Sequence, residues 1–498
     1  MSKNSDRTSM ITIDWKPDRM SQIPIYSQIV SYFSDKISRG DWTSGQLVPS
    51  QRWMSEYFGV NRSTIVEAMN ELASLGMVGG RFGGGTRITN DAWDLMMRSK
   101  APNWKTYFRE SSFFSNLPVV QIINRLEFDS RFVRLGTGEL SPEVLPGDLV
   151  QTVLRKMSEK RPFINYPDQM GLPRLRQVVS EHLKRYGIEI PPSCILIVSG
   201  ALQALHLVSA GLISSKSTLY VESPSYITSL NLFQSGGVRL EKVSMDQCGL
   251  IPWLMKAGDQ GLRKSMLYTI PTFQNPTGFV MPLYRRIELL NYCREYRIPL
   301  IEDDVLRDMW LDAPPPPPVK SMDEQGSVLY IGSISKIFAP GMRIGWVAGS
   351  ESVIRRLADV KMQMDYGVSS LAQEVSCELL ESGLYSQGTA SVRERLRERR
   401  DWMLELLEKY FSPYADWKRP AGGFFVWVHL KKRVSADWLF EEALKQKILL
   451  NPGSIYDSRF VSCLRISFGY LSKQEMEEAL KILAGILYRA ERKKEAGQ

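Results

Sequence analysis

Apolar residues recur at helical spacing three times near the start of the chain. The pattern predicts helices over 26–37, 52–58 and 62–75, with Ser50 as the N-cap of the second. A tight turn separates the second helix from the third. A glycine-tipped hairpin is expected over 81–89.

This order of helices and hairpin is typical of a winged helix-turn-helix, in which the second helix of the pair enters the major groove of DNA. We expect the residues before Pro24 to form a polar tail. Charge alone does not reveal the domain, because residues 1–90 contain ten Lys and Arg against eight Asp and Glu. A small helical protein-interaction domain is the alternative explanation. The candidate DNA-contacting residues are Arg52, Asn61, Arg62, Ser63, Thr64, Arg81 and Arg87.

From about residue 131, short apolar runs alternate with helical patterns, which predicts an α/β sheet covered by helices. In such folds ligands bind at the loops that follow the strands. Residues 91–130 show no sustained period and several aromatics, so we expect a linker that partly docks on one of the domains. Strands are expected over 194–198, 218–222, 265–269, 300–302 and 328–331, and helices over 203–212, 227–234 and 283–296.

One lysine stands among hydroxyls and glycines directly after the apolar run 328–331. Burial and a nearby cation lower a lysine pKa and make the amine a nucleophile that can form a Schiff base. Ser333, Ser335 and Arg343 lie close to Lys336 in sequence and predict a phosphate cradle. A surface turn with a solvated lysine is the alternative for this stretch alone.

Other polar groups also follow strand-like runs. Gly200, Ala201 and Leu202 open a helix whose first N–H groups can hold an anion. Three acids at 302–304 end an apolar strand and would repel one another unless a cation is present. Arg465 lies inside another apolar strand, where an arginine is rarely unpaired. Solvated helix-capping acids are the alternative for 302–304.

Specific motifs in both parts resemble known families. Val-Pro-Ser-x-Arg at 48–52, Gly-Val-x-Arg-Ser-Thr-Ile at 59–65 and Gly-Gly-Gly-Thr at 83–86 resemble the GntR family of bacterial regulators. The stretch around Lys336 resembles type I aminotransferase-fold proteins, which bind pyridoxal 5'-phosphate (PLP) as an aldimine. This combination is similar to the MocR/GabR family of PLP-dependent regulators, and the resemblance spans nearly the whole chain.

The resemblance assigns expected roles around the cofactor. It implies that Lys336 is the Schiff-base lysine and that Arg343 is a phosphate ligand. It implies that Tyr226 stacks on the pyridine ring and that Asn275 bonds its phenolic oxygen. Asp303 would keep the pyridine nitrogen protonated, so that the ring acts as an electron sink.

The resemblance implies a winged helix-turn-helix domain in 1–90, a linker in 91–130 and a PLP-binding domain of the type I aminotransferase fold in 131–498. The expected function is a transcription regulator that binds a double-stranded DNA operator as a homodimer. It would sense PLP, or an amine or amino-acid effector, through an aldimine on Lys336, and Arg465 would clamp an effector carboxylate. The alternatives are a functional aminotransferase with an accessory DNA-binding domain and a PLP-free scaffold. We expect at most weak or vestigial transaminase activity.

The chain departs from this family at two places. Val305 and Leu306 occupy the positions where a tyrosine usually contacts the cofactor. A histidine and a tyrosine usual near 386–400 are also absent. Fewer contacts are expected to weaken cofactor binding or alter aldimine basicity, which suits a sensor better than a fast catalyst.

Composition excludes several classes of protein. Five scattered cysteines lack the spacing of a zinc site or disulfide framework, and three histidines argue against a histidine-built metal site. The start of the chain lacks an apolar signal core. The sequence contains no uninterrupted run of about 18 apolar residues, so we expect no membrane span. A cytoplasmic protein without a metal centre is therefore expected.

Overall fold

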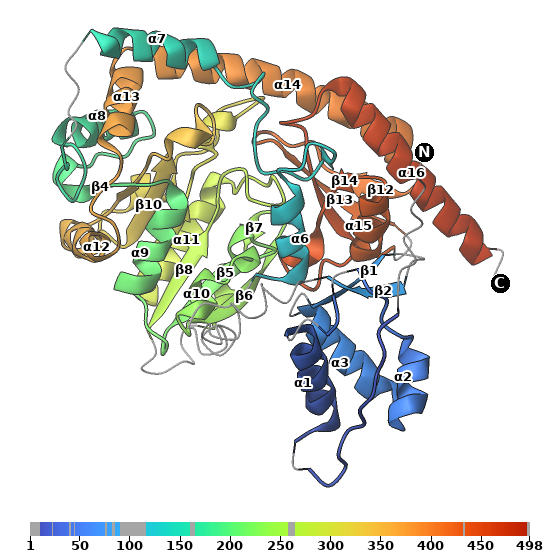
Figure 1. Ribbon diagram of the computed structural model, residues 1–498. Coiled ribbons are helices and arrows are strands. Elements are labelled where there is room, and N and C mark those ends of the chain that lie inside the picture. Colours follow the sequence, from blue (N-terminus) through green and yellow to red (C-terminus); the bar gives the residue numbers. More distant parts are fainter. Residues whose placement is uncertain are drawn as a thin grey trace. The chain divides into compact units, whose positions relative to one another are not determined.

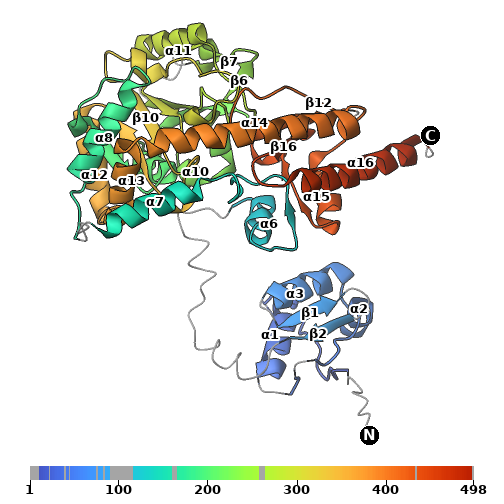
Figure 2. The same ribbon diagram turned by 90° about the horizontal axis from the view of Figure 1, so that it is seen from above.

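The computed structural model describes residues 10–21, 23–38, 41–43, 45–74, 77–81, 85–89, 116–159, 165–256, 264–431 and 434–495. These residues fall into two compact units, Met1–Ser111 and Ser112–Gln498, which are considered separately (Figures 1 and 2). Residues 91–115, which make up most of the expected linker, lie outside the described residues.

The first unit has the predicted three helices and hairpin. Its elements are α1 (Ile25–Ser38), α2 (Gln51–Phe58), α3 (Arg62–Ser74), β1 (Val78–Arg81) and β2 (Gly85–Ile88). The two strands pair antiparallel. The apolar faces of all three helices meet in one core that includes Phe33, Phe58 and Leu72.

Local chemistry explains the turn between α2 and α3. The Ser50 hydroxyl accepts a hydrogen bond from the Trp53 amide at 3.2 Å and caps the start of α2, as predicted. Gly59 ends that helix in the left-handed conformation, with φ of 65°. A side chain disfavours this conformation, so glycine allows α3 to start only a few residues later.

The prediction of a polar tail before Pro24 is wrong for part of that segment. Ile11 and Ile13 are buried, and the Ile11 amide donates to the Leu47 carbonyl at 2.9 Å. Trp15 stacks on Tyr32, with 4.7 Å between ring centroids. Apolar and polar residues alternate here over too few positions to predict a strand. The alternation nevertheless places the apolar side chains of this segment in the core.

The second unit is built on an eight-stranded sheet in the order β4-β11-β10-β9-β8-β5-β6-β7. The central strands run parallel, whereas β11 is antiparallel to both of its neighbours. The carboxyl ends of β4, β5, β8, β9 and β10 therefore share one edge. Bounds are β4 (Ile195–Val198), β5 (Thr218–Ser223), β6 (Arg239–Asp246), β7 (Gly249–Leu250), β8 (Ser265–Thr269), β9 (Leu300–Asp303), β10 (Val328–Ser333) and β11 (Gly345–Ala348).

Helices cover both faces of this sheet. In β8, Met266 and Tyr268 pack in the cluster that contains α9 and α12, whereas Leu267 packs in the cluster that contains α11. Successive strand residues point to opposite faces, so these helices lie on different sides (Figure 1). Bounds are α6 (Pro118–Leu126), α7 (Gly147–Ser158), α8 (Pro173–Lys184), α9 (Ala201–Gly211), α10 (Leu232–Ser235), α11 (Leu283–Glu295), α12 (Glu351–Met364) and α13 (Ser370–Glu381).

One predicted helix of this unit is wrong. Instead of a continuous helix over 227–234, the chain forms a 3-10 turn at Tyr226–Ser229 followed by the four-residue α10. The Tyr226 amide donates to the Asn275 carbonyl at 2.9 Å. This long-range contact belongs to the loop that follows β8, and helical periodicity does not reveal it.

A smaller sheet in the order β12-β13-β16-β15 lies with the C-terminal helices (Figure 2). Among the described residues, no helix combines the length and apolar character needed to cross a membrane. Bounds are β3 (Val133–Arg134), β12 (Ala415–Trp417), β13 (Phe425–Leu430), β14 (Ile448–Leu449), β15 (Asn451–Pro452), β16 (Cys463–Ser467), α14 (Leu384–Phe411), α15 (Ala436–Lys445) and α16 (Lys473–Glu495).

Candidate ligand-binding cavity and DNA-binding face

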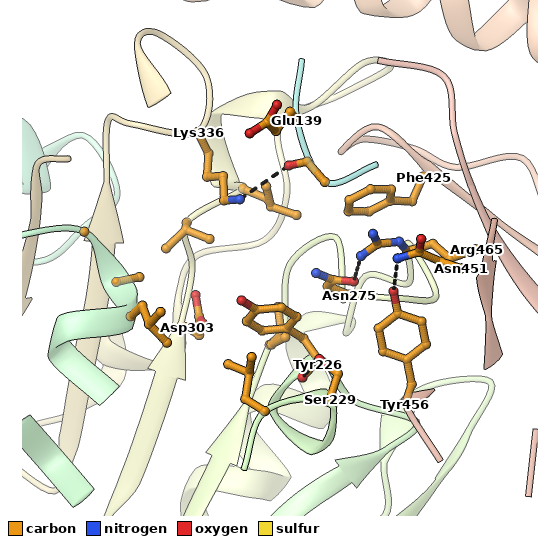
Figure 3. A pocket seen from close by; sticks show the side chains of 18 of the residues that line it. Glu139, Tyr226, Ser229, Asn275, Asp303, Lys336, Phe425, Asn451, Tyr456 and Arg465 are labelled. Carbon is orange, nitrogen blue, oxygen red and sulfur yellow. Dashed lines mark hydrogen bonds between the residues drawn. The ribbon is translucent and has the colours of Figure 1, made fainter. Parts of the chain in front are cut away.

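A cavity of about 420 Å³ opens at the carboxyl edge of the large sheet. Figure 3 shows side chains from the large sheet, from the smaller sheet and from loops converging on it. It gathers every residue of the second unit that the sequence proposed for a site. These are Gly200, Ala201, Leu202, Tyr226, Asn275, Asp303, Ser333, Ser335, Lys336, Arg343 and Arg465.

Lys336 follows β10 and extends into the cavity (Figure 3). Its Nζ donates to the Gly138 carbonyl at 3.4 Å. Although its side chain is accessible from within the cavity, the surrounding walls desolvate the ammonium and lower its pKa, and the positive charges of Arg465 and Arg343 lower it further. The deprotonated amine, which is the nucleophilic form, is thereby favoured.

Asp303 ends β9 and has one oxygen oriented by the fold. Its Oδ2 accepts a hydrogen bond from the Tyr268 hydroxyl at 2.8 Å. Its Oδ1 is buried and has no hydrogen-bond partner among the described residues. Desolvation raises the pKa of Asp303 to about 6. A ligand N–H would supply the missing donor and favour the charged carboxylate. Tyr268 was not among the predicted site residues, because an apolar strand pattern does not reveal where a hydroxyl points.

Gly200 and Arg343 form a tight corner of the cavity. Gly200 precedes α9 with φ of 77° and ψ of 166°, a region that only glycine readily adopts. A Cβ atom at this position would lie 2.5 Å from Arg343 Nη2. That guanidinium donates to the Ser199 carbonyl at 3.4 Å, so it is held against the start of α9. A helix N-terminus beside an arginine favours an anion.

The two serines of the predicted phosphate cradle already have partners. The hydroxyls of Ser333 and Ser335 both donate to the Ile344 carbonyl, at 2.8 and 3.0 Å. The Ile344 amide donates back to Ser335 Oγ at 2.8 Å. Both residues line the cavity, and both also stabilise the loop between β10 and β11.

Arg465 extends from β16 into the opposite part of the cavity (Figure 3). It donates to Asn275 Oδ1 at 2.9 Å and to the Gly136 carbonyl at 2.8 Å. Its guanidinium carbon lies 4.1 Å from the ring centroid of Phe425 and 5.4 Å from that of Tyr456. Its Nε is buried and has no partner among the described residues. The fold therefore orients this cation and leaves N–H groups available to a ligand.

Sequence reasoning missed several cavity residues. Phe425 and Tyr456 flank Arg465, and neither was assigned a role from the sequence. A further wall comes from α6, which lies entirely inside the segment expected to be linker. Its amphipathic pattern is the signal that could have revealed it.

Val305 and Leu306 both line the cavity. Leu306 is also buried in the main core cluster of the unit. Apolar side chains therefore occupy the positions at which the family that this chain resembles usually has a tyrosine.

In the first unit, the predicted DNA-contacting residues differ in exposure. Asn61, Arg62 and Ser63 are exposed at the start of α3, while Thr64 is half-buried. Arg52 is exposed and pairs with Glu56 at 3.3 Å.

The wing residues differ in a similar way. Arg87 is half-buried and donates to the Gly45 carbonyl at 2.8 Å. Arg81 ends β1, and its side chain lies outside the described residues.

Comparisons with known proteins match each unit separately. Residues 130–483 match the family aminotransferase class I and II, and residues 25–88 match the family bacterial regulatory proteins, gntR family. The multiple substrate aminotransferase of Thermococcus profundus is 27% identical, with a TM-score of 0.73 over 79% of this chain and 100% of its own. The kynurenine aminotransferase of Pyrococcus horikoshii is also 27% identical, with a TM-score of 0.72 over 79% and 98% of the two chains. The predicted combination of a winged helix-turn-helix with an aminotransferase fold is confirmed.

Relatives that match most of the chain carry regulator names. The uncharacterized HTH-type transcriptional regulator YisV of Bacillus subtilis is 42% identical over 95% of this chain and 98% of the relative. The HTH-type transcriptional regulator NorG of Staphylococcus aureus (strain USA300) is 33% identical over 87% of this chain and 97% of the relative.

Proposed function

We propose that this chain, which belongs to the family of HTH-type transcriptional regulators that join a GntR DNA-binding domain to an aminotransferase class I and II domain, controls transcription in response to a small molecule. This small molecule binds together with PLP in the cavity beside Lys336. The observation that carries this proposal is the convergence of Lys336, Asp303, Arg343 and Arg465 on one cavity. A nucleophilic amine, a carboxylate and two cations match the groups of PLP and of an amino acid.

The residues at the ring end fit PLP. When bound, PLP supplies an aldehyde that reacts with amines and a pyridine ring that withdraws electrons. Lys336 offers the amine, and the unpartnered oxygen of Asp303 offers an acceptor for the pyridine N–H. Tyr226 supplies a flat ring in the same cavity. Asn275 uses its oxygen toward Arg465 and retains its Nδ2 to donate to the phenolic oxygen.

The corner around Gly200 fits the phosphate. Arg343 supplies the charge, and Gly200, Ala201 and Leu202 supply the start of α9. Ser333 and Ser335 would have to rotate their hydroxyls away from the Ile344 carbonyl to donate to a phosphate. We therefore assign the main phosphate contacts to Arg343 and the helix start.

Arg465 is the proposed site of an effector carboxylate. Its planar guanidinium can donate two parallel hydrogen bonds to a carboxylate. Phe425 and the loop at Gly136 hold it in place, so little side-chain entropy is lost on binding. The effector is then an amine or amino acid that reaches both Arg465 and the Lys336 end of the cavity.

The first unit contributes the DNA-binding face. Asn61, Arg62 and Ser63 are exposed at the start of α3, where side chains of such helices meet base edges. We propose that Thr64, Arg52, Arg81 and Arg87 contribute phosphate or base contacts.

The remaining assignments follow from the same family. We assign 1–90 to the DNA-binding domain, 91–130 to a linker whose last part, α6, packs on the following domain, and 131–498 to the PLP-binding domain. We propose a cytoplasmic homodimer that binds two half-sites of a double-stranded DNA operator.

A working aminotransferase is the second candidate, and the likeness to solved aminotransferases over 79% of the chain favours it. Apolar Val305 and Leu306 argue for weak turnover, because they cannot donate a hydrogen bond to the cofactor. Multiple turnovers with an amino donor and a 2-oxo acid would establish this activity.

Visible absorption and DNA binding test the proposal together. The PLP-loaded chain should show a protein-bound absorption band that amines change, and Lys336→Ala should lack it. Lys336→Arg is the matched control, because it keeps a long basic side chain but cannot form the covalent bond. Binding to the DNA upstream of its own gene should depend on Arg62, with Arg62→Ala weaker than Arg62→Lys. A colourless protein, or DNA binding indifferent to Arg62, would contradict the proposal.

A further inference from the structure

One wall of the cavity is a face of α6, the first described helix of the second unit. Val120, Ile123, Asn124 and Glu127 all line the cavity, at spacings of three, four and seven residues from the first. This spacing places them on one side of a helix. Ile123 is buried in the core and fixes the helix in position. A ligand here would meet two apolar side chains and then two polar ones.

Glu127 is an acid without a cationic partner among the described residues. Its Oε1 accepts a hydrogen bond from the Thr137 hydroxyl at 2.5 Å. In the part of the chain that the structure describes, no Lys or Arg forms an ion pair with it. By contrast, Glu139 in the same cavity lies 3.4 Å from the Arg134 guanidinium. Glu127 also caps the C-terminal end of α6, where the helix dipole is negative. Both the carboxylate and the helix end favour a cation.

Glu127 and Arg465 are connected through two consecutive residues. Arg465 donates to the Gly136 carbonyl at 2.8 Å, and the next residue, Thr137, donates to Glu127. Arg465 is nearly fully buried, and its Nε has no partner among the described residues. An acid and an arginine of the same cavity therefore lie within the span of one small molecule that carries both charges.

From this arrangement we propose that the effector is a basic amino acid. Its carboxylate binds Arg465, its aliphatic stem packs on Val120 and Ile123, and its second amine or guanidinium binds Glu127 and the end of α6. This inference rests on the proposed function, because it takes Arg465 as the carboxylate site. It makes Glu127 the residue that determines effector specificity.

Calorimetric titration of the PLP-loaded full chain with L-lysine, L-norleucine and L-glutamate tests the inference. Lysine and norleucine share the carboxylate, the α-amine and the stem, and lysine adds the terminal amine. We expect lysine to bind roughly tenfold more tightly than norleucine, and glutamate to bind most weakly, because it brings a second negative charge to Glu127.

Variants separate a charge effect from a structural one. Glu127→Gln should bind lysine and norleucine equally, with the affinity for norleucine unchanged. Asp129→Asn is the matched control: it removes one negative charge two residues away, from an acid that is already paired with Arg131 at 2.5 Å. It should keep the preference for lysine. A preference for lysine that survives Glu127→Gln would overturn the inference. An equal loss of affinity for lysine and for norleucine in this variant would overturn it too.

The outcomes distinguish this inference from the proposed function. If norleucine or glutamate binds at least as tightly as lysine to the unmodified chain, the amino-acid site stands and the basic effector is refuted. If none of the three binds to a chain that holds PLP on Lys336, the proposed amino-acid effector fails, and the inference fails with it.

Discussion

Asp303→Asn should stabilise the chain in the absence of PLP. Burial raises the pKa of this carboxyl from 3.8 to about 6, because desolvation disfavours the charged form. Between these two pH values the folded chain binds a proton that the unfolded chain has lost, so stability falls as pH rises. Each tenfold change in proton affinity corresponds to about 1.4 kcal/mol, so the cost at neutral pH is about 3 kcal/mol. An uncharged asparagine avoids it.

Urea unfolding of the PLP-free protein at several pH values measures this effect. Near pH 4 the variant and the unmodified chain should have similar free energies of unfolding. By pH 7 the free energy of unfolding of the variant should exceed that of the unmodified chain by up to about 3 kcal/mol. PLP should bind the variant more weakly, because the pyridine N–H loses its charged partner. The unpartnered carboxylate oxygen is therefore a cost in stability that PLP binding recovers.

Asp304→Asn is the matched control for this experiment. The buried Asp304 accepts hydrogen bonds from Arg307 and from the Tyr330 hydroxyl, both at 3.1 Å. Neutralising Asp304 leaves the Arg307 guanidinium without this counter-charge, so the free energy of unfolding should fall by roughly 3 kcal/mol. An Asp303→Asn variant that is less stable than the unmodified chain at pH 7, or a difference that does not change between pH 4 and 7, would refute the reasoning.

Three other substitutions test separate parts of the structure. Gly200→Ala should lower the free energy of unfolding by about 1–3 kcal/mol and weaken PLP binding, because the new Cβ would lie 2.5 Å from Arg343. Gly147→Ala is the control in unfolding and PLP titrations, because its Cβ would meet no atom within 4 Å. Leu306→Tyr should tighten PLP binding in equilibrium titration by adding a hydroxyl to the cavity wall, and an unchanged affinity would show that the missing tyrosine is unimportant. Ser50→Ala should destabilise the first unit by about 1 kcal/mol in hydrogen exchange, and Ser50→Asp, which can still cap α2, should largely preserve its stability.

The sequence alone determined the elements whose signals are local. Helical spacing and caps identified α1, α2 and α3, because each depends on residues a few positions apart. The motif around Lys336 likewise combines a strand, a turn and a polar stretch within a short segment. Its resemblance to a known family supplied the roles expected of Asp303 and Arg465, which the local pattern did not determine.

Tertiary structure decided which groups meet and which are already paired. It oriented Asp303 with Tyr268, turned the hydroxyls of Ser333 and Ser335 to the Ile344 carbonyl, and brought Glu127 to the cavity from α6. These contacts join residues on separate strands, helices and loops. Hydrophobic periodicity reports only which side of an element is buried, whereas the partner of a polar group depends on how distant segments pack.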